Sequence, residues 1–126
     1  MKSVISAVVI FIFIVVTGLF SAIYVDNVTK EMLQIVYKNE KYFSNLKWKD
    51  ADDEILKLEK YWANKRSVLS VFINHTNLSE VDTAVAKLKN ATKMRENTDF
   101  FYETDNLVLA LLSINEQQKI SIENIF

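Results

Sequence analysis

The residues from Ser3 to Val25 include no charged side chain, and this run constrains the fold more than any other part of the sequence. At about 1.5 Å of rise per residue, a helix of this length spans roughly 34 Å, enough to cross a bilayer core of about 30 Å. Lys2 precedes the run and Asp26 follows it, so the apolar stretch has polar limits on both sides. The sequence therefore predicts a transmembrane helix, with the lipid bilayer as a partner through residues 3–25.

A cleaved signal peptide is the alternative reading of this segment. The apolar regions of signal peptides are only about 7–15 residues long and end at an A-x-A-like cleavage site, which is missing here. Small residues near the end of the run leave cleavage open, and we expect an uncleaved single-pass anchor. The short N-terminal tail with Lys2 favours a cytoplasmic N-terminus and an extracytoplasmic C-terminal domain in the cell membrane, although lysines after the run favour the reverse orientation.

The rest of the chain is expected to be helical. The 126-residue sequence has one Gly and no Pro, the residues on which turns rely most. Apolar residues after Asp26 recur at steps of three and four, which is typical of amphipathic helices. We predict an all-α fold, in which an N-terminal transmembrane helix is continuous with an antiparallel up-down bundle of about four helices. The predicted divisions are a transmembrane anchor (1–25), a helical bundle (26–116) and an apolar C-terminal tail (117–126).

Capping residues and charge patterns predict where each helix begins and ends. An acidic run after residue 49 suits the positive end of a helix dipole. The predicted helices extend from the membrane to about Leu46, from an N-cap at Asp50 to about Asn74, from an N-cap at Thr76 or Asn77, and from Thr98 or Asp99 onward.

The C-terminal sequence KISIENIF is unusually apolar for a chain end, because chain ends are usually polar and frayed. In an up-down bundle this tail lies near the bilayer, beside the end of the second helix. It either locks into the bundle or is offered to a partner or to the lipid surface. Three consecutive aromatic residues in DFFYE cannot share one helix stripe, which leaves Tyr102 for an interface. The predicted partner-binding residues are Ile120, Ile122, Glu123, Asn124, Ile125, Phe126, Tyr102 and His75.

Several classes of function are disfavoured. The net charge of −1 leaves no basic footprint for nucleic acid. With no Cys and one His, the chain lacks the ligand set of a zinc site. The acidic run from Asp50 to Glu54 lacks the Gly and the spacing of a calcium loop. No phosphate loop or nucleophile elbow occurs. We therefore expect no enzymatic activity, no cofactor and no metal.

Four features of the chain occur together: the N-terminal anchor, the spacing of Trp48, Leu58 and Trp62, the stretch LSVFINHTNL and the closing SIENIF. In these features the chain resembles the bacterial domain-of-unknown-function family 4363. The resemblance covers essentially the whole length, and the C-terminal motif is its most specific part. The resemblance implies a small single-pass membrane-anchored helical protein, and it carries over no catalytic residue. It also implies an integral membrane partner of the YetF-like type.

Together these features predict a non-enzymatic, membrane-anchored, extracytoplasmic helical protein that binds or supports another membrane protein. Two alternatives stay open at this point. One is an extracytoplasmic ligand-sensing helical bundle, although such domains normally lie between two membrane spans. The other is a cleaved, secreted helical protein.

Overall fold

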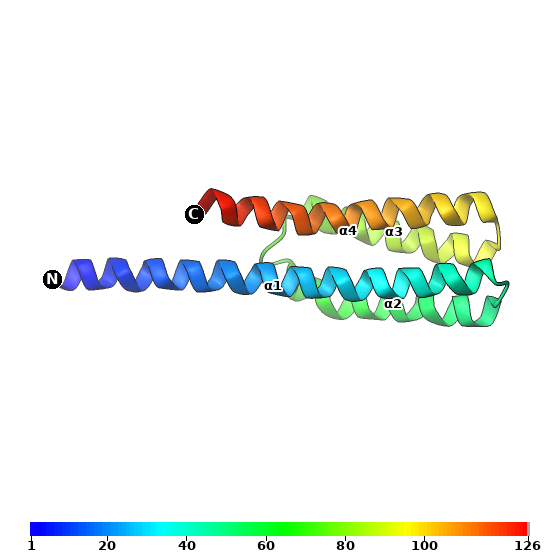
Figure 1. Ribbon diagram of the computed structural model, residues 1–126, viewed down its shortest axis with the longest axis horizontal. Helices are drawn as coiled ribbons and strands as arrows, with labels where there is room; N and C mark the ends of the chain where they lie inside the picture. The colour runs from blue at the N-terminus through cyan, green and yellow to red at the C-terminus, as the bar shows by residue number, and fades with distance from the viewer. Residues whose placement is uncertain (126) are drawn as a thin grey trace.

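The computed structural model describes residues 1–125, without the side chains of Ser121 and Ile125. It contains the helices α1 (Lys2–Ser44), α2 (Trp48–Leu69), α3 (His75–Met94) and α4 (Asn97–Ile125), and no strand occurs among these described residues. Each helix runs antiparallel to the one before it, and α4 returns to pack beside α1 (Figure 1). The predicted all-α bundle with a long apolar N-terminal helix is confirmed.

Helix α1 has two parts with different surroundings. No residue between Lys2 and Phe20 is buried, whereas buried residues recur along the helix from Ser21 onward. Figure 1 shows the first part extending beyond the other helices, with the N-terminus at its far end. By length and composition this helix could span a membrane, a test that a signal sequence near the N-terminus also passes.

The core of the bundle is formed by the inward faces of all four helices. Phe43 of α1 and Phe100 of α4 stack with ring centroids 3.7 Å apart and an interplanar angle of 4°. Phe100 is fully buried, Phe101 is 38% exposed and Tyr102 is 64% exposed, so consecutive aromatic residues do turn away from one stripe. The largest fully buried side chains also include Met32, Ile55, Leu58, Leu69, Leu78, Leu88, Leu107 and Leu111.

The predicted start of the second helix was wrong. Helix α2 begins at Trp48, its N-cap residue Lys47 makes no side-chain capping bond, and Asp50 lies in the first turn instead of at the cap. The physical reason is the tight end of α1, where the N–H of Lys47 donates to the Tyr42 carbonyl at 2.9 Å. The chain has therefore already reversed by residue 47, and the next helix starts at once.

The predicted limits of the second and third helices were also wrong at their junction. Helix α2 ends at Leu69, because the next N–H groups bond three residues back, from Val71 to Val68 and from Phe72 to Leu69. The N-cap of α3 is Asn74, whose side chain accepts a hydrogen bond from the N–H of Asn77 at 2.9 Å. Thr76 and Asn77 thus lie inside the first turn of α3.

Helix α4 begins at Asn97, next to the predicted start, and continues to Ile125. It passes residue 117 without a break, just as α1 passes residue 25. The predicted C-terminal tail is therefore helical in its described part. The assignment of 1–25, 26–116 and 117–126 as separate functional parts stays a prediction.

Candidate functional site

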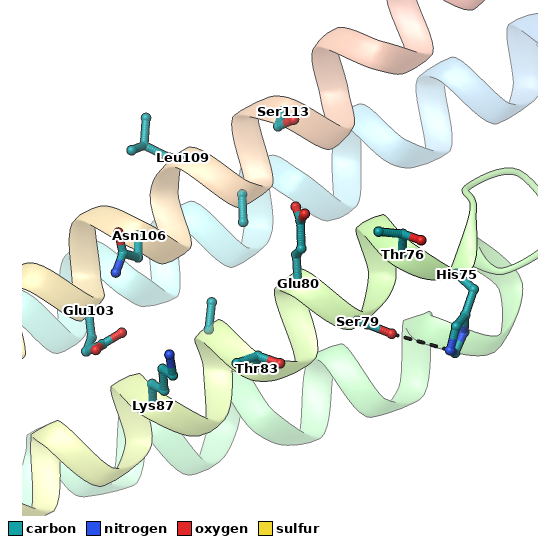
Figure 2. Close-up of a pocket in the computed structure, with 12 residues that line it drawn as sticks. His75, Thr76, Ser79, Glu80, Thr83, Lys87, Glu103, Asn106, Leu109 and Ser113 are labelled. Atoms are coloured by element: carbon teal, nitrogen blue, oxygen red, sulfur yellow. Dashed lines mark hydrogen bonds between the residues drawn. The ribbon is translucent and has the colours of Figure 1, made fainter.

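A groove of about 700 Å³ lies between α3 and α4, and we call it the α3–α4 groove (Figure 2). It exists because Ala84 of α3 and Ala110 of α4 both line it and are too small to fill the space between the helices. The other lining residues are His75, Thr76, Ser79, Glu80, Thr83, Lys87, Glu103, Asn106, Leu109 and Ser113.

The groove carries charges of both signs. Figure 2 shows Lys87 of α3 and Glu103 of α4 on opposite walls at one end, and His75 at the other end. The Oε2 atom of Glu103 is buried and has no hydrogen-bond partner within the described part of the chain. A buried carboxylate oxygen without a donor is unfavourable, so a group entering the groove with an N–H or O–H would stabilise it.

Among the residues that line the groove, Ser79 and His75 most resemble a catalytic nucleophile and its base. The Ser79 Oγ and His75 Nε2 atoms are 3.4 Å apart, longer than the roughly 2.6–3.2 Å of an activated nucleophile and its base. His75 is exposed, and no bond from its other ring nitrogen to an acid is found among residues 1–125. The pair therefore lacks the third group that orients a catalytic histidine.

Three exposed apolar residues lie along the outer face of α4, with polar residues between them. Tyr102 and Leu109 are each 64% exposed and Ile120 is 48% exposed. At about 100° per residue, all three point within about 20° of one another around the helix. We call these residues the α4 stripe. Leu109 also lines the groove, so the α4 stripe meets the edge of the α3–α4 groove at this residue.

The structure places the sequence-predicted residues in three settings. His75 lies in the groove, and Tyr102 and Ile120 belong to the α4 stripe. Ile122 is half-buried against α1, whereas Glu123 and Asn124 are exposed. The side chain of Ile125 and all of Phe126 lie outside the described residues. A binding role for this set stays a prediction.

Sequence reasoning missed the groove itself. Its floor comes from Ala84 and Ala110, which in sequence are ordinary helix-forming residues, and Glu103 is one of many surface carboxylates. Two small residues that meet on facing helices are the signal that could have revealed the groove. To know from the sequence that Ala84 and Ala110 meet, one would need the register of α3 against α4. No group of three or more His, Cys, Asp or Glu side chains that could hold a metal ion is found in the part of the chain that the structure describes.

No curated protein and no solved structure matches the chain. The family described as "Domain of unknown function (DUF4363)" matches residues 19–125. This match includes the last turns of the apolar run and the whole bundle, and therefore the complete α3–α4 groove and α4 stripe. The chain belongs to the domain-of-unknown-function family DUF4363.

Proposed function

We propose that this protein is a non-enzymatic, single-pass membrane protein whose bundle stands on the extracytoplasmic side and binds another membrane protein through the α3–α4 groove. The observation that carries the proposal is the groove itself, a long hollow bordered by the exposed α4 stripe. The unburied apolar part of α1 supports the anchor. Lys2 ahead of that segment supports the orientation.

The groove fits a helix better than a loop or a strand. From His75 to Lys87, its α3 wall extends about 18 Å, the length of roughly three helical turns. Ala84 and Ala110 on the floor allow the backbone of a partner to come close. A helix laid into a groove is a common mode of recognition. Leu109 would contact such a helix at its edge.

The partner helix is expected to come from the membrane. The axes of α3 and α4 lie roughly parallel to the axis of α1 (Figure 1), so a helix that leaves the bilayer beside α1 can continue along the groove. A donor on this helix would pair with Glu103, and an acidic side chain would pair with Lys87. The YetF-like integral membrane protein implied by the family resemblance is the first partner to test.

Site-specific photocross-linking in native membranes tests the proposal. A photoreactive amino acid at Leu109, which is 64% exposed at the groove edge, should capture a discrete membrane protein that mass spectrometry identifies. The matched control carries the same group at Leu56 of α2, which is 39% exposed and lies away from the groove.

A blocking variant completes the experiment. Ser113 is exposed and lines the groove, so Ser113→Trp should fill the hollow without disturbing the core and should abolish capture at Leu109. Equal capture from Leu56 and Leu109, or capture that survives Ser113→Trp, would show that the groove is not the binding surface.

A further inference from the structure

The last turns of α4 lie beside the apolar part of α1. The Asn115 Nδ2 atom donates to Asp26 Oδ1 at 2.9 Å, and Gln118 Nε2 donates to Ser21 Oγ at 2.6 Å. These two bonds fix the antiparallel register of the helices. Because Ser21 lies inside the uncharged run, the α4 residues after Gln118 lie beside that run as well. Figure 1 shows the end of α4, in red, next to the blue part of α1.

Ile122 extends this contact toward the N-terminus of α1. It lines a hollow of about 280 Å³ between the two helices. A Cβ atom added at Gly18 would have no atom of another part of the chain within 4 Å, so the hollow is open there. The α1 residues that share the hollow with Ile122 are Phe13, Ile14, Thr17, Gly18 and Ser21.

The link between α2 and α3 lies at the same height along α1 as the last turns of α4. The ring of Phe72 packs edge-on against Phe20 of α1, with centroids 6.4 Å apart. Its neighbour Val71 is 75% exposed, and Val68 in the last turn of α2 is 41% exposed. Two segments far apart in the sequence therefore present apolar side chains next to the same turn of α1.

The length of the unburied part of α1 is close to the thickness of a bilayer core. From Lys2 to Phe20 the helix is about 28 Å long, close to the roughly 30 Å thickness of a hydrocarbon core. If the core begins at Lys2, its other boundary falls near Phe20 and Ser21. Residues 119–125 of α4 then extend about 10 Å past this boundary, a depth comparable to that of helices lying in a membrane interface.

We propose that the base of the bundle inserts into the lipid of the same bilayer that the anchor crosses, so that α4 ends as a partial second span. The bundle base consists of Val68, Val71, Phe72, Ile120 and Ile122. The inference rests on the membrane anchor of the proposed function. We expect the base to enter the lipid because its apolar surface adjoins the exposed apolar surface of α1 at Phe20.

Two charged residues limit the depth of insertion. Lys119 and Glu123 are both exposed on the last turns of α4. The stem of a lysine can lie along apolar surface while its ammonium group stays among the headgroups. A carboxylate is unfavourable in the middle of a bilayer, so Glu123 keeps the end of α4 in the headgroup and upper acyl region.

Depth-dependent fluorescence quenching tests the inference on the full chain. The sequence has no cysteine, so each single-cysteine variant carries one environment-sensitive fluorophore. Val71→Cys and Ile120→Cys report on the bundle base, Phe11→Cys on the anchor, and Leu46→Cys on the opposite end of the bundle; all four positions are exposed. The proteins are reconstituted into phosphatidylethanolamine–phosphatidylglycerol vesicles with nitroxides at shallow or deep positions of the acyl chain.

We expect the fluorophores at Val71 and Ile120 to shift to the blue and to be quenched best by the shallow nitroxide. The fluorophore at Phe11 should be quenched best by the deep nitroxide, and the one at Leu46 by neither. If Phe11 is quenched while Val71 and Ile120 behave like Leu46, the inference fails and the anchor stands. Without quenching at Phe11, the anchor and the inference fail together. A blue shift at Val71 and Ile120 without quenching would assign the base to a protein contact and overturn the lipid assignment.

Discussion

At the residue scale, the end of α1 depends on one unusual backbone conformation. Leu46 has a φ of 61°, in the left-handed region that favours glycine. Its N–H donates to the Phe43 carbonyl at 3.1 Å, and the next N–H, of Lys47, donates to the Tyr42 carbonyl at 2.9 Å. This pair of bonds defines a Schellman motif. Leu46 therefore occupies the position where glycine usually ends a helix.

Leu46→Gly should stabilise the protein. The leucine side chain is 68% exposed, so little packing is lost, while the strain of a left-handed non-glycine residue is relieved. We expect a gain of roughly 1 kcal/mol, measured as a higher midpoint of thermal unfolding by circular dichroism in detergent.

Arg95→Gly is the matched control, because Arg95 has a similar φ of 58° at the end of α3. Its guanidinium donates to both carboxylate oxygens of Asp52, at 2.7 and 2.6 Å, and lies over the Trp48 ring. Glycine there relieves the same strain but removes these contacts, so the midpoint should fall. A fall for Leu46→Gly would contradict this account of Leu46, and a rise for Arg95→Gly would show that its side-chain contacts matter less than the backbone strain.

A second feature at the residue scale is a buried polar side chain in the core. Asn39 of α1 is fully buried, and its Nδ2 atom donates to Thr92 Oγ1 of α3 at 3.3 Å across the core. The Oδ1 atom of Asn39 has no hydrogen-bond partner in the described residues. Such a group lowers stability, and it also disfavours other registers in which the amide would meet only apolar side chains.

At the element scale, α2 and α3 are joined by a clamp around Asp82. Trp62 donates from Nε1 to Asp82 Oδ1 at 2.6 Å, and Arg66 donates from Nε to both carboxylate oxygens at 2.9 Å. Burial disfavours the charged form of Asp82. The hydrogen bonds from Arg66 and Trp62 outweigh it, so the pKa of Asp82 is lowered from its usual 3.8.

The clamp predicts how stability depends on pH. Because the folded pKa of Asp82 lies below its unfolded value, the stabilisation is fully present above pH 3.8 and is lost as the pH falls through the folded pKa. Asp82→Asn should therefore lower the free energy of unfolding at pH 7 by an amount on the order of 1 kcal/mol, because the pair is partly exposed, and the thermal midpoint should fall with it. Between pH 7 and pH 3, the thermal midpoint of the variant should fall by less than that of the wild type.

Asp105→Asn, a change at an exposed carboxylate of α4, serves as the control and should follow the wild-type pH profile. Parallel profiles for the wild type and Asp82→Asn would show that the clamp does not contribute to acid sensitivity.

The type and order of the elements were predictable from the sequence, but their ends were not. Apolar residues at steps of three and four identify a helix wherever they fall. A helix end depends on which competing cap forms, and Asn74 caps α3 although Thr76 and Asn77 are equally suitable types. At the end of α1, a leucine in a glycine conformation gave no signal at all.

At the scale of the whole molecule, the features that could not be predicted from the sequence depend on how the helices are placed against one another. The α3–α4 groove needs Ala84 to face Ala110, and the position of the C-terminal end along α1 needs Asn115 to meet Asp26. Both are contacts between distant segments. The return of α4 alongside α1 was nonetheless inferred from the helix count. A place for the chain end near the membrane stays a prediction.

The arrangement also bears on whether the C-terminal end locks the bundle. The last buried core residue of α4 among those described is Ile114. Beyond it, Ile120 is 48% exposed, and Ile122 lines a hollow whose other walls belong to the uncharged N-terminal part of α1 and to Gln118. Among the described side chains after Gln118, Ile122 therefore lies against this part of α1, and none belongs to the buried core.

Ending the chain at Gln118 should accordingly leave the bundle nearly as stable as before. In detergent, we expect the thermal midpoint of the full chain to fall by less than about 4 °C, equivalent to under roughly 1 kcal/mol for a domain of this size. Leu111→Ala is the reference, because Leu111 is 1% exposed and its truncation should remove about 2–5 kcal/mol. A fall comparable to that of Leu111→Ala would show that the C-terminal residues lock the bundle. A small fall, together with quenching at Ile120 in vesicles, would place their main contacts with the membrane.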